Sequence, residues 1–273
     1  MLTTIEARNA AGELLTLSLE NPNNGLYIED VDGLDPVKAT IATTSSATRA
    51  GSQYQSSRRE MRNIVITLGL EPDYSVDDIQ TLRERVYNHF MTDEVVKLRF
   101  IDSLPRTVDI VGRVETCATP LFAKESTVAI SILCFEPDFI NSTEVVLEGD
   151  SVNDTTETLV TYPGTAKTGV VFTINIDRTV SEITIYHRGP DDAIRSMEIS
   201  VPLVAGDILT ISSVVGDKHV KLNRLGTVTS VLYGKSTQSD WTTLSKGANH
   251  IRVYITGASI PYTMTYTPRY GGL

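Results

Sequence analysis

Hydrophobic and polar residues alternate in short runs along most of the first 135 residues, and this two-residue period predicts β-strands. Seven strands are expected, over residues 3–7, 14–19, 26–31, 62–70, 95–101, 108–114 and 128–135. The turn-forming cluster Asn9-Ala10-Ala11-Gly12 joins the first two as a hairpin. The first part of the chain is therefore expected to be rich in β-sheet.

One segment of this region has the period of a helix instead. Ile79, Leu82, Val86 and Phe90 recur at spacings of three and four, which predicts a helix over about residues 76–90 with one apolar stripe. Ser75 is the expected N-cap, and Asp78 follows it three residues later as in a capping box. We expect the stripe to pack against a sheet.

Residues 38–57 follow neither pattern. The stretch from Thr40 to Ser52 is rich in small hydroxyl residues and has almost no large apolar ones, so it has little to bury on its own chain. Two interpretations stay open: a mobile loop, or an arm that becomes ordered against a partner.

The second half of the chain shows only the strand period. The predicted strands are residues 170–176, 182–187, 196–201, 208–212, 219–222, 228–233, 250–255 and 262–266. Ile251, Val253 and Ile255 alternate strictly, as in a sheet with one buried face. Eight short strands in roughly 130 residues predict a β-sandwich of jelly-roll or lectin type. Turn residues at 137–143 place the boundary between two domains, 1–140 and 141–273.

Length and composition agree with two ordinary domains. The chain has 273 residues, 41% hydrophobic and 21% charged, a composition typical of globular proteins and not of disordered ones. No apolar run approaches the roughly 20 residues that a membrane helix needs, and the first residues lack the features of a signal peptide. We therefore expect a soluble protein without a membrane partner.

The charge is acidic and unevenly distributed. Residues 1–141 hold 21 acidic and 13 basic side chains, a net charge of −8, whereas residues 142–273 hold 13 and 11. Proteins that bind nucleic acid through its phosphates normally have a basic face, so the balance argues against specific DNA binding. It is compatible with a conduit through which DNA passes without adhering.

Recognisable catalytic motifs are absent from the sequence. His89, His187, His219 and His250 are scattered, without the spacing typical of metal sites. Gly234-Lys235-Ser236-Thr237 resembles the end of a phosphate-binding loop, but Thr229 stands where that loop needs its first glycine. We predict no enzyme activity and assign no catalytic, cofactor-binding or metal-binding residue, although paired carboxylates for glycoside hydrolysis have no local signature.

Acidic clusters offer another kind of candidate site. Asp191-Asp192 and the run Glu29-Asp30-Val31-Asp32 could supply carboxylates to calcium, but neither fits a calcium-binding loop. We interpret both as solvated acidic turns.

Cys117 and Cys134 flank a predicted hairpin, so a disulfide has to be considered. Ile110 and Val114 on the first strand and Val128, Ile130 and Ile132 on the second put the apolar face at even positions. Even positions should then pair with even ones, which leaves Cys117 on the opposite face from Cys134 unless a bulge near Pro120 intervenes. We predict two free thiols.

Trp241 is the single tryptophan. On a lectin-like sandwich it could stack on a sugar, and this gives an alternative function as a carbohydrate-binding adhesin. The other interpretation is a core aromatic that closes one end of the sandwich.

Seven segments spread over nearly the whole length form a recognisable series: residues 33–37, 62–68, 112–115, 130–139, 205–211, 240–251 and 266–273. Taken in this order, they resemble the distal tail protein (Dit) family of siphophages.

The resemblance implies a structural protein of the virion. It implies a homo-hexameric ring at the distal end of the tail, assembled in the cytoplasm of the bacterial host, with a central channel for DNA. The ring-forming domain would be residues 1–140, a β-sandwich with the helix at 76–90. The galectin-like domain would be residues 141–273, pointing outward.

Partners follow from the same resemblance. They are the tail tube protein, the tail-associated tip protein and, in some phages, a receptor-binding or side-fibre protein of the baseplate. Residues 38–57 would act as an oligomerisation arm that reaches a neighbouring subunit, and the last residues, from about 261, would return to the first domain.

Overall fold

The computed structural model describes residues 2–19, 25–45, 47, 48, 50–102, 106–120 and 126–273. The chain forms two compact units, one of Met1–Ser142 with Tyr270–Leu273 and one of Thr143–Arg269. The first unit is thus closed by the last four residues, whereas the segment from residue 261, predicted to return with them, is a strand of the second unit. In the described part of the chain, no helix has the length and apolar character that crossing a bilayer requires.

The first unit is built on one antiparallel sheet, not on the two sheets of the predicted sandwich. The strands run in the order β2-β1-β7-β8-β9-β6-β3; β10 also pairs with β8, and β23 pairs with β10. The bounds are β1 (Leu2–Arg8), β2 (Leu14–Ser18), β3 (Leu26–Asp32), β6 (Arg62–Leu70), β7 (Val95–Asp102), β8 (Thr107–Ala118), β9 (Thr127–Cys134), β10 (Phe139–Asn141) and β23 (Arg269–Tyr270). Inward-facing residues of all nine of these strands share one hydrophobic cluster, so the sheet curves around a single core.

The single α-helix of the described chain, α1 (Ile79–His89), covers this core. Leu82, Val86 and Phe90 are fully buried and Ile79 packs beside them, which confirms the predicted stripe. The predicted N-cap was wrong: Asp78 caps the helix by accepting a hydrogen bond from the Thr81 amide. The Ser75 hydroxyl instead donates to Asp73, which holds it in the preceding turn.

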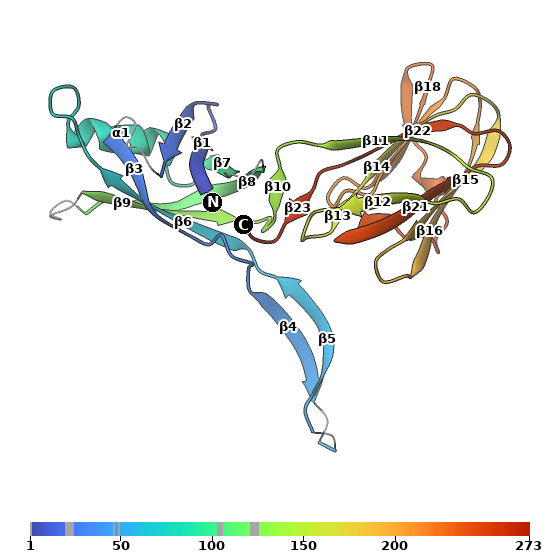
Figure 1. Ribbon diagram of the computed structural model, residues 1–273, viewed down its shortest axis with the longest axis horizontal. Helices are drawn as coiled ribbons and strands as arrows, with labels where there is room; N and C mark the ends of the chain where they lie inside the picture. The colour runs from blue at the N-terminus through green and yellow to red at the C-terminus, as the bar shows by residue number, and fades with distance from the viewer. Residues whose placement is uncertain (1, 20–24, 46, 49, 103–105, 121–125) are drawn as a thin grey trace. The chain divides into compact units, whose positions relative to one another are not determined.

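Residues 38–57 are an ordered hairpin and not a loop. Strands β4 (Ala39–Ser45) and β5 (Ser52–Arg59) pair with each other in a sheet of two strands, the ribbon that leaves the sheet between β3 and β6 in Figure 1. Positions 46 and 49 of the predicted arm lie outside the described residues. The hairpin has no hydrophobic core, so its sequence lacks the alternating pattern from which strands can be predicted.

Both cysteines are free thiols, but one part of the reasoning about them was wrong. A bulge between Val114 and Thr116 shifts the register, so that Cys117 pairs with Ile130 and lies on the core side with Cys134. The two remain apart because Ile130 and Cys134 are four residues, or about 13 Å, from each other along β9. Burial raises the pKa of each thiol to about 11.

The second unit is a sandwich of two antiparallel sheets. One has the order β11-β22-β14-β17-β18-β19 and the other the order β12-β21-β15-β16. The bounds are β11 (Val145–Asp150), β12 (Thr158–Tyr162), β13 (Thr168–Gly169), β14 (Val171–Asn175), β15 (Val180–Arg188), β16 (Ile194–Leu203), β17 (Ile208–Ser212), β18 (His219–Arg224), β19 (Thr227–Ser230), β20 (Thr243–Leu244), β21 (Gly247–Tyr254) and β22 (Pro261–Tyr266). Strands β13 and β20 form a separate pair, and η2 (Leu232–Gly234) is a short 3-10 turn.

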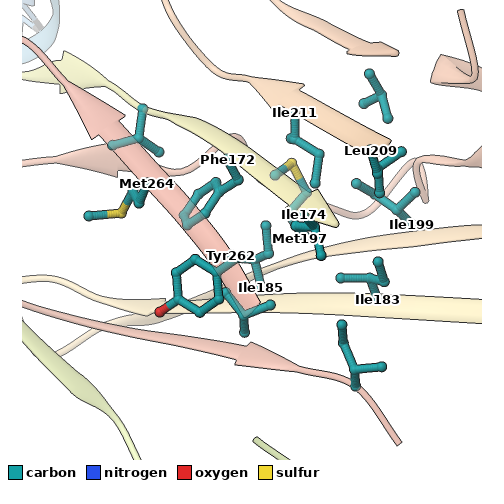
Figure 2. Packing of buried hydrophobic residues seen from close by; sticks show 14 of the residues in the cluster. Phe172, Ile174, Ile183, Ile185, Met197, Ile199, Leu209, Ile211, Tyr262 and Met264 are labelled. Atoms are coloured by element: carbon teal, nitrogen blue, oxygen red, sulfur yellow. The ribbon is translucent and has the colours of Figure 1, made fainter. Parts of the chain in front are cut away.

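The alternating residues of the two sheets meet in one core. Figure 2 shows Phe172, Ile174, Leu209, Ile211, Tyr262 and Met264 of the larger sheet together with Ile183, Ile185, Met197 and Ile199 of the smaller one. The mainly β fold class, with one helix and a C-terminal sandwich, is confirmed. Strands β11 and β12 were missed by the sequence analysis because few of their side chains are buried: none in β11 and two of five in β12.

Candidate functional site

The β4–β5 hairpin is a part of the first unit whose structure is not explained by packing against its own chain. Every described side chain from Ala39 to Arg59 is exposed, and neither strand pairs with any other described strand. An isolated two-stranded hairpin is marginally stable in water because it lacks a third strand or a core. The hairpin therefore presents both faces and both edges to whatever surrounds the molecule.

The base of the hairpin is fixed by ionic contacts. The Arg59 guanidinium donates to both oxygens of the buried Asp138 carboxylate, with Nη2 to Oδ2 at 2.8 Å. This paired geometry is among the stronger polar contacts in proteins. The hydrogen bond with Asp138 raises the pKa of Arg59, so the guanidinium keeps its charge. The amide of Glu60 donates to the carbonyl of Lys38 at 2.9 Å and closes the base.

A buried arginine holds the chain segments that meet beneath this base. Arg62 is 1% exposed and donates to four backbone carbonyls: Gly33, Asp35 (2.7 Å), Pro137 (2.8 Å) and Gly271 (2.6 Å). Its guanidinium also lies 4.3 Å from the ring centre of Phe139. Burial lowers the pKa of Arg62, and the four carbonyls replace the water it has lost.

Gly33 makes the close approach to Arg62 feasible. Its φ of +86° is accessible mainly to glycine, and a Cβ there would lie 2.0 Å from the carbonyl oxygen of Asn63. The segment that enters the hairpin is thus tied to the start of β6.

A largely apolar groove of about 490 Å³ lies beside the hairpin base, and we call it the β8 groove. It exists because β10 pairs with β8 at Val108 and Asp109 whereas β9 pairs with β8 only from Arg113 onward. The intervening residues of β8 form part of the lining, together with three exposed apolar side chains: Val95 (38%), Val111 (52%) and Phe135 (65%).

Charged side chains at the groove are matched. Lys97 Nζ lies 2.8 Å from Asp109, and Arg99 Nε lies 2.7 Å from the same carboxylate. Burial raises the pKa of Asp109, but the hydrogen bonds from Arg99 and Lys97 outweigh it and leave the pKa lower than usual. Exposed apolar area is what the groove offers to a partner.

In the second unit, Trp241 is partly buried and packs against the core. The ammonium groups of Lys218 and Lys235 lie 5.6 and 5.4 Å from its ring centre. A sugar stacking on this ring would compete with both cations. The neighbouring depression, about 400 Å³, is lined mainly by polar residues that include His187 and Asp191.

Each of the four histidines has its own local partner. His89 contacts the Arg85 carbonyl through Nδ1, His219 lies beside Asp217, and His250 lies 3.6 Å from Glu157. Burial lowers the pKa of His187, whose Nε2 lies 3.1 Å from Asn249 Oδ1. Among the described residues, no group of three or more histidine, cysteine or acidic side chains could hold a metal.

The remaining candidates from the sequence have local partners. Lys235, in the segment resembling a phosphate-binding loop, donates to the carbonyls of Ser236 and Ser239. Asp191 pairs with Arg195 at 2.6 Å, which lowers its pKa to about 2. In the acidic run, Asp32 accepts from the Gly33 amide.

Sequence reasoning missed Arg62, Asp138 and the β8 groove. A signal for Arg62 was present: it shares the inward parity of Ile64, Ile66 and Leu68, so an arginine stands where the strand expects a core residue. The groove had no such signal, because it depends on where β9 and β10 leave β8.

Two families match the chain. The family described as siphovirus-type tail component, C-terminal domain, matches residues 163–270, and the phage tail protein RIFT-related domain matches residues 13–111. The two matches do not overlap and together cover most of the chain. Curated protein sequences yield no match.

A solved structure of low sequence identity shares the fold. The Dit protein of phage SPP1, described as a paradigm of the hub adsorption apparatus in phages infecting Gram-positive bacteria, is 16% identical with a TM-score of 0.67, over 97% of this chain and 98% of that one. Chains of the phage P2 baseplate in its activated conformation score 0.48 with calcium (9% identity, all of both chains) and 0.44 with strontium (8%, 96% and 97%).

Proposed function

Because the chain belongs to the siphophage distal tail protein family, we propose that it assembles as a homo-hexameric ring, the hub at the distal end of the tail. In this role it joins the tail tube protein to the tail-associated tip protein and surrounds the path of the DNA. It carries out no catalysis. Its assembly takes place in the cytoplasm of the infected host.

The fully exposed β4–β5 hairpin is the observation that carries this proposal. A ring is built from heterologous contacts, in which one surface of a subunit meets a different surface of the next. A hairpin that buries nothing on its own chain supplies one such surface, and a neighbouring subunit supplies the other. The acidic net charge of −10 suits the channel, because it repels DNA instead of holding it.

The test is the mass of the assembly, measured by light scattering with the full chain alone and mixed with its tip protein. The matched variant replaces residues 40–58 with Asn-Gly, a two-residue turn that keeps Ala39 opposite Arg59 and so preserves the Arg59–Asp138 contact. We expect a ring from the native chain and a monomer from the variant, with the circular dichroism nearly unchanged. A native chain that stays monomeric in both conditions, or a variant that still assembles, would contradict the proposal.

A further inference from the structure

The hairpin has two chemically different faces. One face carries Ala39, Ile41 and Thr43 from β4 opposite Arg59, Ser57 and Tyr54 from β5; we call it the Ile41 face. The other carries Thr40, Ala42 and Thr44 opposite Arg58, Ser56 and Gln53. Among the described hairpin residues, the large apolar side chains Ile41 and Tyr54 thus share one face.

A β-bulge creates this arrangement. Tyr54 stands three residues before Ser57, so a regular strand would place the two on opposite faces. The register shifts between Ala42 and Thr43, which leaves Gln55 without a cross-strand partner and turns Tyr54 to the Ile41 face. Two contacts agree with this: Tyr54 Oη lies 2.9 Å from Ser57 Oγ, and Gln55 Nε2 donates to Thr44 Oγ1 on the other face at 3.1 Å.

The bulge buries neither of the two large apolar side chains within the chain that contains it. Ile41 is 59% exposed and Tyr54 is 62% exposed, so uniting them on one face buries neither. Bulges disrupt a ladder locally and recur where a side chain has to be re-aimed. The gain must come from another molecule.

We propose that the Ile41 face packs into the β8 groove of a second copy of this chain. The proposal rests on the ring proposed above and names the two surfaces that meet in it. Val95, Val111 and Phe135 line that groove with exposed apolar area, and Ile41 and Tyr54 provide a complementary apolar strip. The chain's own hairpin leaves the groove open, because both of its apolar side chains are solvent-exposed.

Charge favours a second copy over an unrelated occupant. Residues 38–60 hold four basic side chains and one acidic, a net charge of +3. The rest of residues 1–141 holds 20 acidic and nine basic side chains, a net charge of −11. A basic hairpin from one copy is therefore attracted to the acidic domain of the next, and such complementarity steers association.

Two variants that both remove the bulge separate its effect from that of a damaged hairpin. Inserting one threonine between Ala42 and Thr43 gives Gln55 a cross-strand partner. It thereby moves Tyr54 to the other face of the hairpin, away from Ile41. Deleting Gln55 also regularises the ladder but leaves Tyr54 opposite Thr43, on the Ile41 face. We expect the insertion to weaken assembly by at least about tenfold, as losing one buried apolar side chain would. The deletion should assemble like the native chain.

Cross-linking tests the receiving surface. Copies carrying Tyr54→Cys are mixed with copies carrying Phe135→Cys or Val111→Cys under oxidised glutathione, with Gln53→Cys on the other face as the control. The native chain, in which burial raises the pKa of both thiols to about 11, is treated in parallel to measure the background from Cys117 and Cys134. We expect disulfide-linked dimers from Tyr54→Cys and not from Gln53→Cys.

The outcomes separate the two proposals. If the Asn-Gly variant is monomeric but the insertion variant assembles normally, this inference is wrong and the proposed ring is unaffected. The same holds if Gln53→Cys cross-links as well as Tyr54→Cys. If the insertion variant assembles normally but no longer retains DNA that the native chain retains, the hairpin faces nucleic acid and the inference is again wrong. If the Asn-Gly variant assembles, the proposed function fails first.

Discussion

The β4–β5 hairpin and the β15–β16 pair of the sandwich have similar backbones and opposite means of support. Each is an antiparallel pair of strands with one shift in register. In β15–β16 the residues facing the other sheet, among them Ile183 and Ile199, are buried, whereas in the hairpin every described residue is exposed. Strand pairing alone therefore does not explain the stability of either pair. The β15–β16 pair is stabilised by the core of the sandwich. The β4–β5 hairpin is held only at its base and, as we propose, by a neighbouring subunit.

The same substitution in both regions should give the largest contrast. We expect Ile185→Ala in β15, where the side chain is fully buried, to lower the free energy of unfolding by about 4 kcal/mol, since it leaves a cavity. Ile41→Ala in β4 should change it by less than about 0.5 kcal/mol in the monomer. Urea denaturation followed by Trp241 fluorescence reports the second unit, and circular dichroism reports both. A clear loss from Ile41→Ala in the monomer would mean that the hairpin packs on its own chain.

Substitutions at the base of the hairpin should lower the free energy of unfolding much more than substitutions in the hairpin itself. Arg62→Met fills the space but leaves four carbonyls without their donor, and we expect a loss of about 3 kcal/mol. The control is Arg58→Met, because Arg58 is 80% exposed and pairs only with Glu60 at 3.6 Å. Calorimetry of the first unit's transition measures both. Equal effects would show that Arg62 does not support the base.

In the sandwich we expect a smaller effect on stability, and one that depends on pH. Hydrogen bonds from Arg224, at 2.8 and 2.6 Å, lower the pKa of Asp207. A lowered pKa in the folded state adds stability above the ordinary value near 3.9, and that stability is lost as the pH falls through the folded pKa. We expect Asp207→Asn to cost about 1 kcal/mol at pH 7 and progressively less towards pH 2. Urea midpoints across this range measure it, with the exposed Asp240→Asn as control; a constant difference at all pH values would contradict the assignment.

The sequence was informative wherever a core imposes a period. Most of the longer core strands and the stripe of α1 could be predicted because their buried residues repeat every two or every three to four positions. The helix start could not, because Asp73 competes for Ser75. The bulges at Glu115 and Gln55 could not be predicted, because a single unpaired residue leaves no trace in a short alternating run. For the hairpin, the sequence analysis could say only that residues 38–57 follow neither period. Its strands could not be predicted, because no core of their own imposes a pattern on them.

The contact between Arg62 and Gly271 has a consequence for synthesis on the ribosome. The first unit is interrupted after Ser142 and is completed only by Tyr270–Leu273, roughly 130 residues later. At 5–20 residues per second, translation of that interval takes about 6–25 s. During this time Arg62 lacks one of its four acceptors, so a nascent or prematurely ended polypeptide has an unfinished hairpin base. The first unit therefore closes only after the second unit has been synthesised, when Arg62 gains its contact with Gly271.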